Sequence, residues 1–160
     1  MDYPNYITPA GFAVLRAEYD QLFGDERPKL VEVISWAAGN GDRSENGDYI
    51  YGRQRLRQID RRLAWLAKRM KAAKVVDPAA APDRTRVFFG ATVTIADEDD
   101  NRRTLTLVGD DEADAGQGRV GWGSPFARAL RGSAVGDLRR VTLPVGEKEY
   151  EVIAITYPAA

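Results

Sequence analysis

The chain of 160 residues contains neither cysteine nor histidine. Without cysteine there can be no disulfide bond and no cysteine nucleophile, and without both residues there is no structural zinc site of the Cys/His kind. Catalytic Ser-His-Asp and Cys-His groups are excluded for the same reason. Any metal ion would therefore have to be a hard cation held by oxygen ligands, such as Mg²⁺.

Long apolar runs are also missing. No run approaches the roughly 18 residues that a membrane-spanning helix requires, and the first residues, MDYPNYITPAGF, lack the basic start and apolar stretch of a secretory signal. Hydrophobic residues make up 44% and charged residues 29% of the chain, as in a folded globular protein. We therefore expect a cytoplasmic protein with no membrane partner.

The first half of the chain has two helical patterns. Thr8 and Pro9 predict a helix start, Gly24 and Pro28 predict an interruption, and the sequence Gly39-Asn40-Gly41 predicts a left-handed end. The second pattern is an apolar seam at steps of three and four, formed by Leu56, Ile59, Leu63, Leu66, Met70 and Ala73. Extended back to Ser44, this helix would be about 45 Å long at 1.5 Å per residue.

Two arrangements of these helices are open. The short Gly-rich connection favours an antiparallel hairpin, in which the first helix returns directly onto the second. The alternative is a parallel coiled coil between two chains. We predict the antiparallel coiled-coil hairpin for residues 1–77.

The pattern changes after the PAAAP sequence of residues 78–82, and we predict a linker over residues 78–84. Short β-branched segments then predict strands at residues 87–89, 92–95, 105–108, 141–143 and 150–155, and residues 97–101 predict a hairpin turn. The acidic stretch 110–118 is expected to be an exposed loop, and Ser124-Pro125 to start a short helix. The expected fold class is α+β, with a small globular domain over residues 85–160.

The stretch GDRSENGDY at residues 41–49 carries the densest candidate chemistry. Asp42 and Glu45 have the spacing of a helix capping box, and acids in a first turn complement the helix dipole. Asp48 adds a third carboxylate that capping does not require. Two or three carboxylates make an incomplete Mg²⁺ site, because Mg²⁺ takes its remaining ligands from water, a substrate phosphate or a partner.

Several longer motifs resemble a known family. The segment GDRSENGDYIYGRQRLRQIDRR is similar to the signature of the bacterial transcript-cleavage (Gre) factors, and to their GreB branch more than to GreA. The similarity extends along the chain through YITPAGF, ERP at 26–28, KVVDP at 74–78, VFFGA at 87–91, SPFARAL at 124–130 and VGD at 135–137.

This resemblance implies a coiled-coil hairpin followed by an FKBP-like domain without isomerase activity. It implies a monomer that binds RNA polymerase at its secondary channel and stimulates cleavage of the 3′ end of backtracked RNA, without being an enzyme itself. Asp42 and Glu45 would hold the second Mg²⁺ of the polymerase active site and the attacking water. The alternatives are a channel-binding regulator that inhibits without cleavage and a coiled-coil adaptor whose acids only cap a helix.

The resemblance also assigns supporting residues. Arg43, Ser44, Asn46, Asp48 and Tyr49 match the acidic tip, where the family usually has alanine in place of Gly47, a change that is expected to loosen the first helical turn. Arg53, Arg57 and Arg61 would contact the phosphates of the extruded RNA, although such residues are often a solvated helix face. Ser124, Pro125 and Phe126 would contact the polymerase, the alternative being a helix cap with a buried aromatic ring.

Overall fold

A computed structural model describes residues 4–39 and 47–159 of the chain. The residues divide into two compact units, one formed by Phe12–Ala72 and the other by Met1–Gly11 together with Ala73–Ala160. This division differs from the predicted domains because the first eleven residues belong with the C-terminal part of the chain. Within the described residues, no helix is both long enough and apolar enough to cross a membrane.

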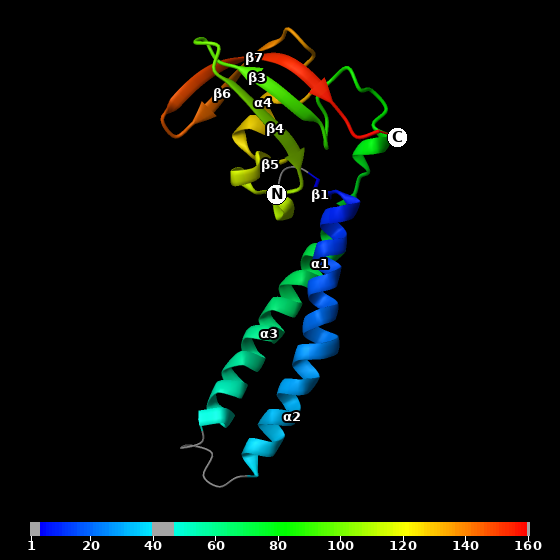
Figure 1. Ribbon diagram of the computed structural model, residues 1–160, viewed down its shortest axis with the longest axis vertical. Helices are drawn as coiled ribbons and strands as arrows, with labels where there is room; N and C mark the ends of the chain where they lie inside the picture. Colours follow the sequence, from blue (N-terminus) through cyan, green and yellow to red (C-terminus); the bar gives the residue numbers. More distant parts are fainter. Residues whose placement is uncertain (1–3, 40–46, 160) are drawn as a thin grey trace. The chain divides into compact units, whose positions relative to one another are not determined.

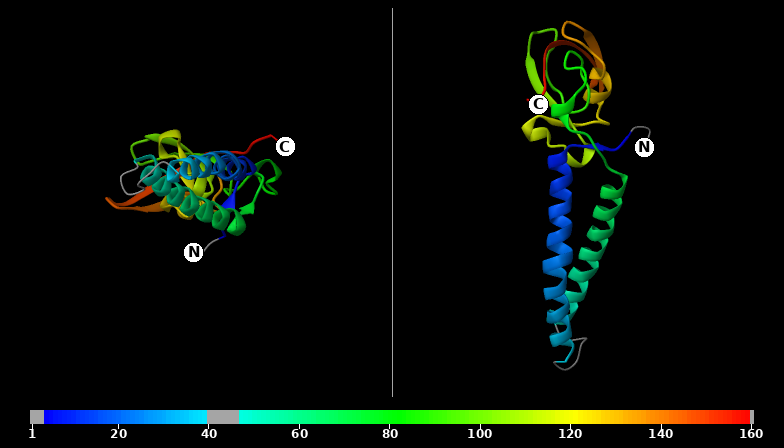
Figure 2. Two further views of the ribbon diagram at one scale, coloured as in Figure 1. Left: turned by 90° about the horizontal axis from the view of Figure 1, so that it is seen from below. Right: turned by 90° about the vertical axis from the view of Figure 1, so that its right-hand side faces the viewer.

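The helical unit is an antiparallel hairpin within one chain, so the prediction of a hairpin is confirmed (Figure 1). Helix α1 (Pro9–Gln21) continues through the π-helical turn η1 (Leu22–Glu26) into α2 (Arg27–Ala38), and α3 (Gly47–Ala72) returns alongside α2 in both further views (Figure 2). The predicted interruption is this π turn, in which the Arg27 N–H donates to the carbonyl of Leu22. Pro28 has no N–H to donate to a carbonyl of the preceding turn, and the missing hydrogen bond favours a local π turn.

The seam of the hairpin is narrower than the predicted one. Ile59, Leu63 and Leu66 are buried on α3, whereas Leu56 and Met70 are only partly buried. Gly52 is also buried, and a Cβ atom there would lie 2.7 Å from Cγ1 of Ile34 on α2. The two helices therefore approach closely at Gly52, a contact that the apolar pattern did not indicate.

The second unit contains a five-stranded curved sheet (Figure 1). Its strands are β3 (Thr92–Ala96), β4 (Arg102–Val108), β5 (Arg119–Gly121), β6 (Leu138–Leu143) and β7 (Gly146–Thr156), in the order β5-β4-β3-β7-β6. Neighbouring strands are antiparallel except for β4 and β5. Helix α4 (Pro125–Leu130) contributes to the core, which includes Val93, Leu107, Phe126, Leu130, Val141 and Val152. The expected α+β class is confirmed.

Some predicted strands differ from the observed ones. The Val87–Phe89 segment forms no strand, and only Arg86 beside it makes an isolated bridge, to Ala134. Strand β5 was not predicted, since its three residues have no alternating pattern. The turn at residues 97–101 is confirmed, and an Asp97 carboxylate oxygen accepts from the N–H groups of Asp99 and Asn101, both at 2.9 Å.

The N-terminal segment joins the sheet unit through a short parallel ladder. Strand β1 (Tyr6–Ile7) pairs with β2 (Lys74–Val75), directly before α1 and after α3. The Tyr6 ring lies 5.4 Å from the ring of Phe89 and 5.9 Å from that of Trp122, measured between centroids. These contacts explain why the first residues belong to this unit rather than to the hairpin.

The predicted linker is tied to the same unit. Its first residues form a 3₁₀ turn, η2 (Pro78–Ala80), whose Ala79 N–H donates to the Asp77 carboxylate at 3.0 Å. The Arg84 guanidinium donates to the carbonyls of Ala79 and Pro158, at 2.7 and 2.8 Å. The segment is therefore held by hydrogen bonds and is not a free spacer.

The prediction that residues 110–118 form an exposed loop is wrong for Glu112, which is buried. Glu112 closes a 3₁₀ turn, η3 (Asp110–Glu112), and its side chain is only 2% exposed. Its carboxylate accepts from the N–H groups of Gly109, at 2.8 Å, and of Thr8, at 3.0 Å, and lies 3.6 Å from the Arg119 guanidinium. Burial is possible because these donors replace the water that the carboxylate gives up.

Candidate functional site

The two acids of the predicted metal-binding pair lie in the connection between α2 and α3. Helix α2 ends at Ala38 and α3 begins at Gly47, so Asp42 and Glu45, together with Arg43, Ser44 and Asn46, fall outside the described residues. Gly39 has φ −84°, so the expected left-handed helix end is not at this residue. The role of the acidic pair remains a prediction.

Two residues of the predicted supporting set are described. Asp48 is exposed in the first turn of α3, where a negative charge complements the helix dipole. Tyr49 is partly buried in the same turn. Among residues 4–39 and 47–159, no three His, Cys, Asp or Glu side chains are grouped so that they could hold a metal ion.

The predicted basic patch is an exposed stripe on α3. Arg53, Arg57 and Arg61 follow at intervals of four residues, which places them along one side of the helix. The Arg53 guanidinium lies 6.0 Å from the centroid of the Tyr49 ring, at the outer limit of a cation–π contact. Arg57 and Arg61 pair with no side chain of the described residues, so their charges are available to another molecule.

Other arginines of α3 are neutralised within the hairpin. Arg55 pairs with Glu26 at 2.8 Å, and Arg62 forms a fork with Glu18 at 2.5 and 2.8 Å. The hydrogen bonds from Arg62 lower the pKa of the Glu18 carboxyl below its usual value of 4.5. The hairpin therefore has two kinds of arginine, those that bind α1 and η1 and those that face solvent, and the sequence alone did not separate them.

The predicted docking residues also fall into two groups, those whose side chains make contacts within the sheet unit and one whose side chain is exposed. The Ser124 hydroxyl accepts from the Ala127 N–H at 3.2 Å and so caps α4, and Phe126 is buried with its ring 5.6 Å from that of Tyr150. These contacts match the alternative of a helix cap with a buried aromatic. Pro125 is exposed, whereas Ser124 is partly buried and Phe126 is buried, so Pro125 is the most accessible of the three to a partner.

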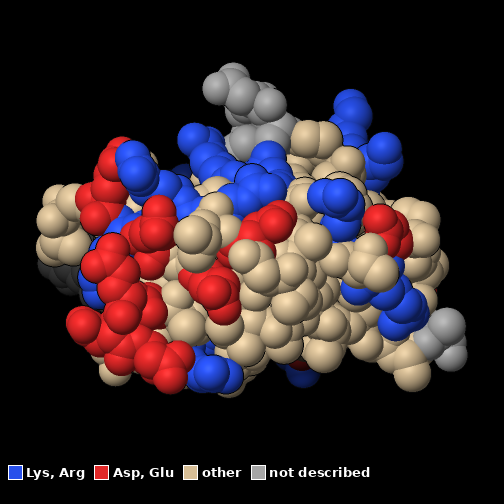
Figure 3. Space-filling view, turned by 90° about the horizontal axis from the view of Figure 1, so that it is seen from above, with Lys and Arg blue, Asp and Glu red and all other residues tan. Residues whose placement is uncertain are grey.

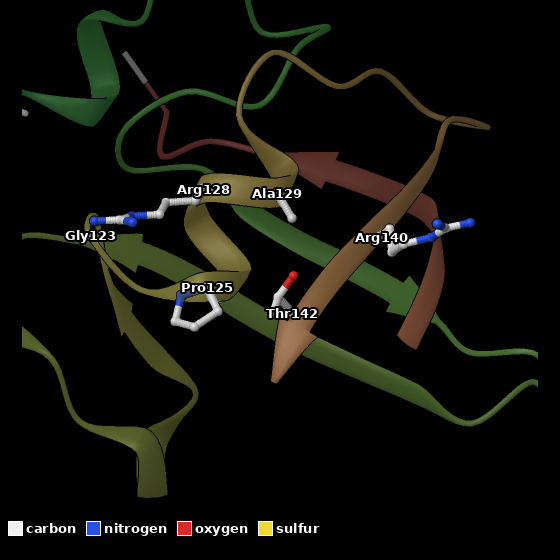
Figure 4. A pocket seen from close by; sticks show the side chains of 6 residues that line it. All are labelled: Gly123, Pro125, Arg128, Ala129, Arg140 and Thr142. Carbon is white, nitrogen blue, oxygen red and sulfur yellow. The ribbon is translucent and has the colours of Figure 1, made fainter. Parts of the chain in front are cut away.

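Pro125 lines a surface hollow of about 460 Å³ between α4 and β6. Figure 4 shows Arg128 and Arg140 on opposite sides of this hollow, with Pro125, Ala129 and Thr142 between them. Arg140 lies 3.6 Å from Glu147 of β7. Arg140 and Thr142 were not predicted as site residues, because nothing in the sequence shows that β6 lies beside a helix that precedes it.

Charges are unevenly distributed over the surface, with acidic side chains gathered on one side of the view and basic ones along another (Figure 3). A smaller hollow, of about 170 Å³, lies between the β3–β4 turn and the start of β7 and is lined by Asp97, Glu98, Asp99, Glu147, Lys148 and Glu149. Hydrogen bonds from Asn101 lower the pKa of Asp97. The sequence predicted this region only as a turn.

Both halves of the chain match models of transcription elongation factors. Residues 5–75 match the model "Transcription elongation factor, N-terminal", and residues 81–157 match "Transcription elongation factor, GreA/GreB, C-term". The two matches together span both the helical hairpin and the sheet unit.

Individual relatives agree with these matches. The chain is 48% identical to transcription elongation factor GreB of Neisseria meningitidis serogroup B over 96% of this chain and 94% of that protein. It is 45% identical to GreB of Yersinia pestis, covering 96% and 89%, and 40% identical to GreA of Alkalilimnicola ehrlichii, covering 94% and 96%. The chain belongs to the GreA/GreB family of transcription elongation factors, which confirms the resemblance drawn from its motifs.

Proposed function

We propose that this chain binds RNA polymerase through the secondary channel and stimulates cleavage of the 3′ end of RNA in backtracked complexes. The observation that supports this most is the GDRSENGDY segment, which connects α2 to α3 in a chain that matches the family over both units. In the sequence, Asp42 and Glu45 fall between the end of α2 and the start of α3. Helix α3 has 26 residues, so it extends about 39 Å from that turn.

The acids suit a shared metal site rather than a complete one. Carboxylate oxygens are the ligands that Mg²⁺ prefers, and two of them leave most coordination positions to the polymerase, the RNA phosphate and water. Bound Mg²⁺ would supply an activated water and stabilise the charge that develops on the leaving oxygen. Asp42 and Glu45 would contribute negative charge and orient water at a site that the polymerase completes.

The remaining surfaces would hold the chain in place. Arg57 and Arg61, unpaired within the described residues, would contact phosphates of the extruded RNA, and Arg53 would extend this contact toward the acidic connection. Pro125 and the hollow beside it would receive a segment of the polymerase. Ser124 and Phe126 would act indirectly, by forming and fixing helix α4.

The test uses stalled, backtracked polymerase that carries end-labelled RNA. The double variant Asp42→Ala with Glu45→Ala should reduce cleavage at least a hundredfold and leave polymerase binding nearly unchanged. The matched control removes two exposed acids of the β3–β4 turn, Glu98→Ala with Asp99→Ala, and should cleave like the parent. Parent-like cleavage by the first variant would contradict the mechanism, whereas slower nucleotide addition by the parent without short RNA products would indicate a regulator that does not cleave.

A further inference from the structure

The open arginine stripe of α3 is bounded at both ends by aromatic residues. Tyr49, Arg53, Arg57, Arg61 and Trp65 follow one another at a constant spacing of four, and we call these five residues the α3 stripe. From Tyr49 to Trp65 the helix rises about 24 Å. Trp65 is 40% exposed, so part of its ring can be reached by another molecule. The stripe thus combines unpaired positive charge with exposed aromatic surface.

The Trp65 ring is held in place by a chain of contacts. The guanidinium carbon of Arg62 lies 4.4 Å from the ring centroid, within the range of a cation–π contact. Arg62 itself is fixed by its two hydrogen bonds to Glu18 on α1. The two hydrogen bonds orient the guanidinium against the ring, and this contact reduces the rotational freedom that the ring has to lose when it binds a ligand.

An exposed tryptophan by itself does not indicate a site, because single exposed apolar side chains are common. Trp36 on α2 illustrates this, since it is 65% exposed and makes no ring or cation contact with any described residue. Trp65 differs in two respects: its ring is fixed by the Glu18–Arg62 pair, and it follows two arginines that have no partner in the described part of the chain. Fixed aromatic surface beside open positive charge is the combination that binds single-stranded nucleic acid.

We propose that Trp65 is a stacking site for a nucleobase of single-stranded RNA whose phosphates contact Arg57 and Arg61. This inference rests on the proposed function, which supplies an RNA 3′ end beside the hairpin. Arg62 covers part of the indole, and the exposed remainder of the ring receives the base. Every base has an aromatic face, so this contact adds affinity without sequence preference.

The position of Trp65 makes the contact depend on strand length. The axial rise of about 24 Å from Tyr49 to Trp65 alone takes about seven nucleotides at the 3.4 Å rise of a stacked strand, and the path is longer because each step of four turns the stripe by about 40° around the helix. An RNA of three or four nucleotides that begins at the acidic connection does not reach the ring. Trp65 therefore increases the affinity for longer extruded RNA segments only. The arginines nearer the connection contact the phosphates of short and long segments alike.

The test measures binding of labelled strands to the full-length protein at low salt by fluorescence anisotropy. One strand is a twelve-nucleotide oligouridine, and the other has the same twelve phosphates and riboses but no bases. Trp65→Leu, which keeps an apolar side chain without an aromatic face, should weaken oligouridine binding about fivefold or more. It should leave binding of the abasic strand unchanged, and Trp65→Phe should recover part of the loss.

Two controls keep the result specific. Trp36→Leu removes a more exposed tryptophan outside the stripe and should not change binding of either strand, and circular dichroism should show parent-like helix content for every variant. The inference is wrong if the parent binds both strands equally, if Trp65→Leu weakens both equally or neither, or if no binding to oligouridine is measurable. Equal binding of a poly-glutamate peptide of the same charge would show an acidic protein segment to be the ligand and would also overturn it.

Failure of this inference and failure of the proposed function give different results. Cleavage of backtracked RNA that depends on Asp42 and Glu45, without any preference for bases at Trp65, would leave the function intact and remove the stacking site. Base-dependent binding at Trp65 without polymerase-dependent cleavage would support the stacking site and contradict the proposed function.

Discussion

Thr8 and Glu112 lie 104 residues apart in the sequence and are joined by two hydrogen bonds, from the Thr8 N–H and from the Thr8 hydroxyl to the Glu112 carboxylate. The same hydroxyl accepts from the Gly11 N–H at 3.0 Å and so caps α1. The first turn of α1 and the turn at Gly109 therefore share one buried carboxylate. A Cβ atom on Gly11 would lie 2.2 Å from this carboxylate, so no larger residue fits there without a shift.

Replacing this carboxylate should strongly destabilise the sheet unit. Glu112→Ala leaves the buried N–H of Gly109 and the partly buried N–H of Thr8 without acceptors, which we expect to cost about 3 kcal/mol. Glu112→Gln keeps one oxygen and should cost less. Urea unfolding followed by Trp122 fluorescence, in a background with phenylalanine at positions 36 and 65, measures the change. Glu98→Ala, an exposed acid of the same unit, is the control, and an equal loss in both variants would contradict this role of Glu112.

Two glycines of α3 should respond in opposite directions to the same substitution. Alanine favours a helix over glycine by about 1 kcal/mol, and a Cβ atom on Gly47 meets no atom within 4 Å, so Gly47→Ala should stabilise the first turn. At Gly52 the added Cβ would press against Ile34, and Gly52→Ala should destabilise the hairpin by about 1 kcal/mol or more. Thermal unfolding followed by circular dichroism at 222 nm compares the two variants. Stabilisation by both would show that α2 moves aside at Gly52 without cost.

The Glu18–Arg62 pair should make the stability of the hairpin depend on pH. Because the pKa of Glu18 is lower in the folded chain than its ordinary value of 4.5, its contribution is present above pH 4.5 and is lost as the pH falls through the lowered folded value. The pair is partly exposed, so the contribution is small, about 0.5 kcal/mol. Urea unfolding of the parent and of Glu18→Gln at pH 6 and pH 3 should show a smaller pH-dependent loss in the variant. Identical losses in both would exclude this contribution.

Substitutions at neighbouring residues of α4 should separate folding from docking. Phe126→Ala removes a buried ring and should cost about 3 kcal/mol of stability. Pro125→Asp places a negative charge beside the hollow but suits the first position of a helix, so it should leave stability nearly unchanged. Under the proposed function it should weaken polymerase binding at least fivefold in a pull-down titration. Parent-like binding by this variant would exclude the hollow as a docking surface.

The sequence predicted most of the regular structure because local patterns determined it. The seam Ile59, Leu63 and Leu66, the helix starts at Pro9 and Pro125 and the turn at residues 97–101 all depend on residues within a few positions of one another. It did not predict strand β5, whose parallel pairing with β4 is a long-range contact. It also placed Glu112 in an exposed loop, since an acid among acids gives no signal that distant donors will surround it.

For the candidate site, the sequence alone indicated the family and the position of the arginines along α3, and it predicts Asp42 and Glu45 as the metal-binding pair. The tertiary structure decided which arginines are open, because only the folded hairpin brings Glu26 and Glu18 to Arg55 and Arg62 and leaves Arg57 and Arg61 without such partners in the described residues. It also decided that Phe126 is a core residue, that Pro125 borders a hollow and that the Trp65 ring contacts Arg62. The reason is physical: spacing along the chain defines which side of a helix a residue lies on, but pairing and burial depend on elements that only folding brings together.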